Sequence, residues 1–246
     1  MEEIPSPRPV HNLNASPLVP DAPSFDLVQV KFPFFVSLRD LDGEGMEQRL
    51  VAELSREPAS RIDLFVKDTG RGGEAFLAAA KLCGVTVFAD AIATERMKRR
   101  MPGTFVVYAE SLTAEEVRDL FVKLSAEDAK TTQRTFDSLH VVGASAGDQK
   151  ELKDVLGFDP GPWKRTATTP PADQKPISAG TADQLTKSVS TSGPKAVEKS
   201  AVLMSFGPTA SRTPPVASKE LKQYNEKRGE RKPNTVPVMI VIRVAG

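Results

Sequence analysis

A run of alternating apolar segments between Arg61 and Leu156 constrains the fold of this chain more than any other feature. Short apolar stretches alternate there with segments whose apolar residues recur at helical spacing. The apolar stretches are residues 62–66, 85–89, 104–109 and 136–142. Strands separated by helices need crossover connections, which favour a parallel or mixed sheet. We therefore expect an α/β fold with a mixed or largely parallel sheet of successive β-α-β units, either ferredoxin-like or small and Rossmann-like.

Turn and capping residues mark the helix boundaries within this run. Gly84 stands where a C-cap glycine belongs, and Thr113 with Glu116 forms the pattern of a capping box. Residues 126–135 are polar, so we expect a loop there. Before the run, residues 25–38 predict a strand interrupted by a proline, and residues 46–54 predict a helix.

Proline-rich and polar segments divide the chain of 246 residues. The composition predicts a disordered Pro-rich N-terminus and a flexible Ser/Thr/Pro/Gly/Lys-rich linker. The expected boundaries are 1–24 for the N-terminus, 25–163 for an α/β core domain, 164–198 for the linker and 199–246 for a C-terminal β-α-β segment. Trp163, after Pro-Gly-Pro, is expected to pack against the core and end the core domain.

The C-terminal segment carries strands that need a partner. Residues Val238 to Val244 are strongly apolar and β-branched, and such a strand left at an open edge promotes aggregation. A unit of about 45 residues with one helix is too small to form a core of its own. We therefore expect the segment to dock on the main sheet or to pair with a second chain.

Charge and cysteine content argue against several classes of protein. The formal net charge is +1, so no overall field favours nucleic acid or a membrane surface. No stretch has the roughly 18 apolar residues that a membrane span needs, and the first residues lack the apolar core of a signal peptide. The single cysteine, Cys83, cannot form an intramolecular disulfide. These features predict a soluble protein in the cytoplasm.

The segment Gly143-Ala144-Ser145-Ala146-Gly147 lies between a predicted strand and a predicted helix. It resembles the nucleophile elbow of α/β-hydrolases and patatin-like lipases, which implies Ser145 as nucleophile. Both histidines, His11 and His140, precede Ser145, whereas the histidine of α/β-hydrolases follows the serine. A turn in which Ser145 or Asp148 caps the next helix accounts for the same residues. A serine hydrolase using Ser145 remains the second alternative function.

The segment Gly70-Arg71-Gly72-Gly73-Glu74-Ala75 follows one predicted strand, and Asp90 ends the next. It resembles the dinucleotide-binding fingerprint, which implies phosphate binding by the glycine turn and ribose binding by Asp90. Residues 67–69 separate the strand from the first glycine, and Asp68 adds an anion there. A turn with Asp68 or Thr69 as N-cap explains the same residues. A Rossmann-like nucleotide-binding protein using the Gly70–Ala75 turn is the first alternative function.

The acidic segment Asp40-Leu41-Asp42-Gly43-Glu44-Gly45 resembles the front half of an EF-hand loop. It also resembles the first motif of haloacid-dehalogenase-like phosphatases. Val51 stands at the twelfth loop position, where an EF-hand needs a bidentate glutamate. We expect a solvated acidic turn and no metal site.

The candidate motifs together lack a complete catalytic set. The chain has two histidines and one cysteine, and His140 is expected to be a packed core residue. The leading interpretation is a non-enzymatic module for protein–protein interaction or assembly, with no catalytic residue, no cofactor and no metal. Its expected partner is another protein or a second copy of the chain. A nucleic-acid partner is not expected, and a small-molecule ligand stays open.

Overall fold

A computed structural model describes residues 33–161, 163, 199–206, 218–228 and 234–245, all within one compact unit. One open, seven-stranded mixed sheet runs through this unit, which confirms the expected α/β fold with a mixed sheet. The predicted N-terminal segment 1–24, the first part of the predicted strand at 25–32 and the linker 164–198 lie outside the described residues.

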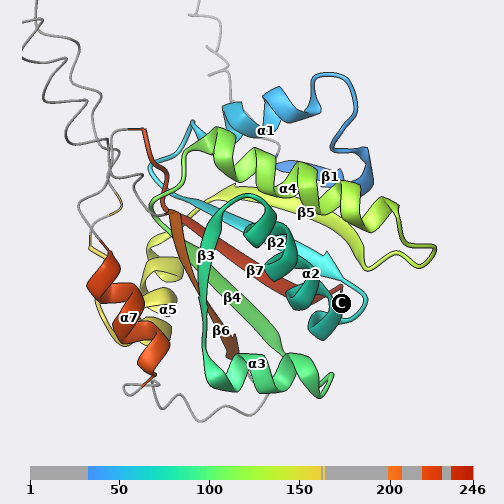
Figure 1. The fold of residues 1–246 in the computed structure, drawn as a ribbon. Helices are drawn as coiled ribbons and strands as arrows, with labels where there is room; N and C mark the ends of the chain where they lie inside the picture. The colour runs from blue at the N-terminus through green and yellow to red at the C-terminus, as the bar shows by residue number, and fades with distance from the viewer. Residues whose placement is uncertain (1–32, 162, 164–198, 207–217, 229–233, 246) are drawn as a thin grey trace, which may run out of the picture. The chain divides into compact units, whose positions relative to one another are not determined.

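The sheet has the strand order β1-β5-β2-β7-β4-β6-β3 (Figure 1). The strands are β1 (Phe34–Ser37), β2 (Ser60–Val66), β3 (Val85–Ala89), β4 (Thr104–Ala109), β5 (Phe136–Gly143), β6 (Lys199–Phe206) and β7 (Val238–Val244). Two neighbouring pairs, β2 with β7 and β3 with β6, are parallel. The other pairs are antiparallel.

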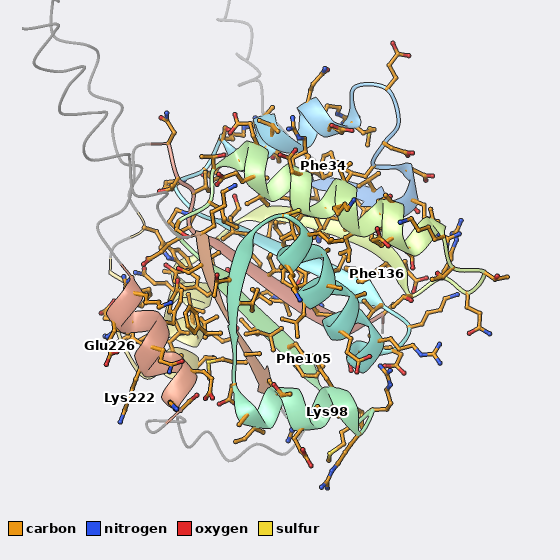
Figure 2. The ribbon with its side chains drawn as sticks, viewed as in Figure 1. Phe34, Lys98, Phe105, Phe136, Lys222 and Glu226 are labelled. Atoms are coloured by element: carbon orange, nitrogen blue, oxygen red, sulfur yellow. The ribbon has the colours of Figure 1, made fainter. Side chains whose placement is uncertain are left out.

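Helices cover both faces of the sheet. They are α1 (Met46–Leu54), α2 (Thr69–Leu82), α3 (Ala91–Lys98), α4 (Ala114–Ala129), α5 (Ala146–Leu156) and α7 (Lys219–Lys227), with a short 3-10 turn η1 (Leu38–Asp40). Helices α1 to α4 share one core with the sheet, and α5 and α7 share a second core on the opposite face (Figure 1). Phe105 and Phe136 lie in the first core, whereas Lys222 and Glu226 are exposed on α7 (Figure 2).

The four strands of the central run keep the order of a ferredoxin-like sheet. Without β6 and β7, the order reads β5-β2-β4-β3 after the edge strand β1. The run β2, α2, β3, α3, β4, α4 and β5 thus contains a split β-α-β arrangement, with α3 added between β3 and β4. In a Rossmann-like sheet β2 and β3 would be close neighbours, but here three strands separate them.

The C-terminal segment lies within the sheet rather than docking at an edge. Strand β7 is the central strand, paired with β2 and β4, and β6 lies between β4 and β3. A buried ion pair between Arg228, at the end of α7, and Glu110, at the end of β4, ties the segment to the core. The apolar strand Val238–Val244 therefore finds the partners it needs in the same chain.

Local structure follows the sequence closely, with α2 and α5 beginning earlier and α4 ending later than expected. Gly84 has φ of 71°, and the capping box of α4 is present, as predicted. Trp163 packs against the second core, also as predicted. The loop expected at 126–135 is wrong for its first residues, because α4 continues to Ala129. Asp128 in this last turn is buried and hydrogen-bonded to Arg39, a residue far away in sequence.

Candidate functional site

The Gly70–Ala75 segment lies inside a helix rather than in a loop. Helix α2 begins at Thr69, before the first glycine. Asp68 is its N-cap, and the Asp68 carboxylate accepts a hydrogen bond from the Arg71 amide at 2.9 Å. The capping interpretation of Asp68 is therefore confirmed, and the expected glycine turn is the first turn of α2.

The glycines allow α2 to lie close to the sheet and to α3. A Cβ atom on Gly72 would lie 2.8 Å from a methyl carbon of Val66. A Cβ atom on Gly70 would lie 2.9 Å from the carbonyl oxygen of Met97. Both distances are too short for a side chain to fit without displacing its neighbour. Close packing alone thus explains these glycines.

Asp90, the other part of the predicted nucleotide site, lies at the opposite end of α3 from Met97, the residue that this segment contacts. It is the buried N-cap of α3, and its carboxylate accepts hydrogen bonds from the amides of Ile92 and Ala93. Asp90 follows β3, which is four strands away from β2 in the sheet. At about 4.8 Å per strand, strands β2 and β3 are themselves roughly 19 Å apart, so they are not the adjacent strands that the fingerprint requires. The structure does not bring the two parts of the fingerprint together.

Ser145 lies at the opposite end of the sheet. Strand β5 is antiparallel to β2, so Gly143 pairs with Ser60 at the start of β2, whereas α2 follows the end of β2. Ser145 is the N-cap of α5. Its hydroxyl accepts a hydrogen bond from the Asp148 amide at 3.1 Å and donates one to the Asp148 carboxylate at 2.6 Å. The capping interpretation is confirmed, and the two Gly-rich segments do not form one site.

No histidine of the described chain is placed to activate Ser145. The ring of His140 meets the ring of Phe35 edge-on, with 6.1 Å between the centroids. The expectation that His140 lies in the core is wrong, because its neighbours Leu139 and Val141 on β5 take the core-facing positions. A serine nucleophile needs an adjacent base. The carboxylate beside Ser145 is instead paired with an arginine and serves a helix cap.

The residues around the Asp148 carboxyl group favour its ionised form. Burial would raise its pKa, but hydrogen bonds from the Ser145 hydroxyl and amide and from Arg61 together lower the pKa below its ordinary 3.8. Because the pKa is lower in the folded state than in the unfolded state, the ionised carboxylate stabilises the fold above about pH 4. This contribution is lost as the pH falls through the folded-state pKa.

We expect Asp148→Asn to lower the free energy of unfolding by about 1–2 kcal/mol at pH 7 and by less at pH 3. Urea unfolding followed by circular dichroism at both pH values measures this difference. Asp154→Asn changes an exposed carboxyl group on the same helix and should have an effect below about 0.5 kcal/mol. An Asp148→Asn effect that is equal at both pH values would contradict the assigned role.

The acidic segment Asp40–Gly45 is a turn between η1 and α1. Asp42 and Glu44 are exposed, and Gly45 has φ of 75° as N-cap of α1. Across the part of the chain that the structure describes, no group of three or more histidine, cysteine, aspartate or glutamate residues could hold a metal ion. This turn therefore offers no set of metal ligands within the described residues.

The Cys83 thiol has the properties of a packed side chain. It lies at the end of α2 and is partly buried against the first core. Burial raises its pKa, and the nearby Asp119 carboxylate raises it further. A higher pKa leaves less thiolate at neutral pH, so Cys83 is a poor candidate nucleophile.

Helices among the described residues cover one face of the sheet only in part, and no sequence motif marks this face. Helices α5 and α7 pack against β4, β6 and β7 on this face. Apart from the buried Asp63, most side chains of β1, β5 and β2 that point the same way remain partly or largely exposed. We call this surface the open sheet face, and its residues are Phe35, Phe65, His140, Val142 and Arg243. Phe35 is 64% exposed, the highest value among the exposed large hydrophobic residues described.

Buried charge holds the open sheet face in a fixed arrangement. The Arg243 guanidinium lies over the Phe65 ring, 4.9 Å from its centroid, and 3.3 Å from the Asp63 carboxylate. Asp63 is only 5% exposed and also pairs with Arg61 at 3.1 Å. The two arginines compensate the buried carboxylate from both sides, so the ring and the guanidinium of the face are positioned before any partner binds.

A second surface feature is a pocket of about 600 Å³ where β2 ends and α2 begins. We call it the cationic pocket. Its charged residues are the cations Arg39, Lys67, Arg71 and Arg134 and the carboxylate Asp68. Its remaining residues are Thr132, Gln133 and Thr135. The pocket brings together three segments of chain that are distant in the sequence.

Neither surface has a local signal in the sequence. Successive side chains of a strand point to opposite faces of the sheet. The neighbours of Phe35 on β1 and of His140 on β5 face the core, so Phe35 and His140 are predicted to lie on the other face. This alternation does not predict whether a helix covers the face they share. The cationic pocket depends on η1, the start of α2 and the 132–135 loop meeting at one place. Both surfaces therefore follow from strand order, although the cationic pocket includes Arg71 of the glycine segment.

Comparison of the chain with protein-family models, curated proteins and solved structures found no match. Among the described residues, no helix combines the length and apolar character that crossing a membrane would require. The function of the chain must therefore be inferred from its own surfaces.

Proposed function

We propose that this chain is a non-enzymatic module that binds another protein, either a different chain or a second copy, through the open sheet face. The observation that carries the proposal is the exposed Phe35 ring beside His140, with the stacked pair of Arg243 and Phe65 on the same face of the sheet. Aromatic and arginine side chains supply much of the binding energy of protein interfaces.

The geometry of these side chains favours binding. Burying a phenylalanine side chain contributes roughly 1.5–3 kcal/mol of favourable free energy. Because Phe35 is largely exposed, most of this free energy would be gained only when a partner covers the ring. Phe35 is on a strand and contacts the His140 ring. A ring that is already held in place loses little conformational entropy when a partner covers it.

The C-terminal strands do not support this proposal. They were expected to need a partner surface, but β6 and β7 each pair with two strands of the same chain. The support comes instead from the open sheet face. Two further expectations remain predictions. One is that the chain binds neither a membrane nor nucleic acid. The other is a cytoplasmic location, which is based on the single cysteine.

The two alternative functions have less support from the described geometry. A nucleotide site at the Gly70–Ala75 segment would need Asp90 nearby, but the two lie at separate strands of the sheet. A serine hydrolase would need a base beside Ser145, whose hydroxyl is engaged in a helix cap.

Phe35→Asp is expected to weaken partner binding at least about tenfold, because it replaces the most exposed ring of the face with a charge. Leu82→Asp is the matched control, since Leu82 is 61% exposed but lies at the end of α2, outside the open sheet face. Size-exclusion chromatography with light scattering over a range of protein concentrations measures self-association and the effect of each variant.

A photo-crosslinking amino acid at position 35, compared with one at position 82, tests for a different partner chain. Crosslinked protein from cell extract is identified by mass spectrometry, and its affinity for the natural chain and for both variants is then measured. The proposal fails if the chain is monomeric at every concentration and position 35 yields no crosslinks beyond those at position 82.

A further inference from the structure

One wall of the cationic pocket is fixed by hydrogen bonds around Asp128. Arg39 donates from Nε to the Asp128 carboxylate at 2.8 Å and from Nη2 to the carbonyl oxygens of Asp128 and Thr131 at 2.7 and 3.1 Å. The other carboxylate oxygen accepts a hydrogen bond from the Thr135 amide at 2.8 Å. The Asp128 side chain has no exposed area. The wall is thus in place before any ligand arrives, which lowers the entropic cost of binding.

Three cations at this pocket have no carboxylate partner among the residues that the structure describes. They are Lys67, Arg71 and Arg134, and all three side chains are exposed. The one carboxylate that lines the pocket, Asp68, accepts a hydrogen bond from the first turn of α2 and lies 4.0 Å from Arg100. Asp68 is therefore engaged with the helix end and lies near Arg100, and it offsets only one of the positive charges that line the pocket.

The pocket consequently attracts an anion. Four cations line it, against Asp68 and the Asp128 carboxylate behind Arg39, so a net positive charge remains. The N-terminus of α2 adds a smaller contribution of the same sign. Guanidinium and ammonium groups bind phosphate oxygens by short, charge-assisted hydrogen bonds.

The other lining residues indicate what the anion is attached to. Thr132, Gln133 and Thr135 can donate hydrogen bonds to, or accept them from, hydroxyl groups. None of the described lining residues is aromatic, so a nucleobase would find no ring to stack on. The volume of about 600 Å³ lies within the roughly 300–1,000 Å³ range of small-molecule pockets.

We infer that the cationic pocket binds the phosphate group of a small, hydroxyl-rich phosphate monoester. Arg71 and Arg134 contact the phosphate oxygens together with Lys67, and the fixed Arg39 forms the wall behind them. The polar residues 132, 133 and 135 contact the remainder of the molecule. This site is separate from the open sheet face, so it stands or falls independently of the proposed function.

Isothermal titration calorimetry with ribose 5-phosphate, inorganic phosphate and ribose, at one ionic strength set with sodium chloride, tests the inference on the full chain. We expect ribose 5-phosphate to bind more tightly than inorganic phosphate and ribose not to bind. Amide signals of residues 67–71 and 132–135 should shift in nuclear magnetic resonance spectra when ribose 5-phosphate is added.

Arg71→Gln and Arg134→Gln should each weaken the binding of ribose 5-phosphate by about tenfold, because each removes one charge-assisted contact. Both side chains are exposed, so circular dichroism should show unchanged folding. Lys81→Gln is the control, since it removes an exposed cation at the other end of the same helix and should leave the affinity unchanged.

Several results would overturn the inference. No binding of ribose 5-phosphate, or equal weakening by Lys81→Gln, would show that the cationic pocket is not the site. Equal affinity for inorganic phosphate and the ester would overturn the assignment of an ester. Tighter binding of a phosphoserine peptide than of ribose 5-phosphate would overturn the assignment of a small molecule.

Discussion

Replacing Ile240 with aspartate is expected to unfold the sheet, because Ile240 is a core-facing residue of the central strand β7. It pairs with Ile62 on β2 and with Val107 on β4, and it is 1% exposed. A carboxylate at this position would be buried without a partner, which costs several kcal/mol. We expect a loss of at least about 4 kcal/mol, a large part of the roughly 5–15 kcal/mol that stabilises a typical domain.

Val244→Asp is the matched control for this prediction. Val244 lies at the end of the same strand and is 52% exposed, so the new charge remains in water and the expected change is below about 1 kcal/mol. Guanidinium unfolding followed by circular dichroism measures both variants. If Ile240→Asp unfolds at the same denaturant concentration as the natural chain, the central position of β7 is wrong.

Replacing Gly72 with valine is expected to have the second largest effect, about 2–3 kcal/mol of lost stability. The new Cβ atom would lie 2.8 Å from a methyl carbon of Val66 and 3.4 Å from one of Ile242. Both neighbours are fully buried on strands β2 and β7, so neither can move aside without disturbing the sheet. The helix α2 would have to shift away from its packed position.

Two comparisons separate this packing effect from helix propensity. Ala78→Val, at an exposed position on the same helix, should cost only a few tenths of a kcal/mol. Gly72→Ala should be neutral or destabilising, whereas propensity alone predicts a gain of about 1 kcal/mol. Differential scanning calorimetry measures these variants, and a stabilised Gly72→Ala protein would contradict the packing role of this glycine.

The elements of the central run could be predicted because their signals are local. The strands at 85–89 and 104–109 have the predicted bounds, since each is a short apolar stretch between turn residues. The capping boxes of α4 and α5 depend on residues only three positions apart. The end of α4 was missed because the partner of Asp128 is Arg39, 89 positions away in the chain.

The order of the strands could not be predicted in the same way. The residues of β6 and β7 show that both strands are apolar on both faces, which indicates burial. They do not show that β7 separates β2 from β4, because the pairing of strands depends on contacts between distant segments. A C-terminal segment docked at an edge would have satisfied the same apolar pattern.

The candidate motifs show the same limit at the level of sites. The Gly70–Ala75 segment and Asp90 are separated along the sequence as in a nucleotide fingerprint. This sequence spacing forms a binding site only if β2 and β3 are close neighbours in the sheet. The glycine at position 72 instead permits close contact with Val66. Of the residues that form the cationic pocket, Arg71 belongs to the glycine segment, whereas Arg39 and Arg134 belong to no motif.

The sequence by itself determined the fold class, the positions of the helices and strands and the caps that begin several helices, because hydrophobic periodicity and capping act over a few residues. Only the tertiary structure decided that β7 is the central strand, that Phe35 and Phe65 share an open face and that Lys67 and Arg134 meet at one pocket. These features depend on which strands become neighbours, and that choice is made by packing between segments far apart in the chain.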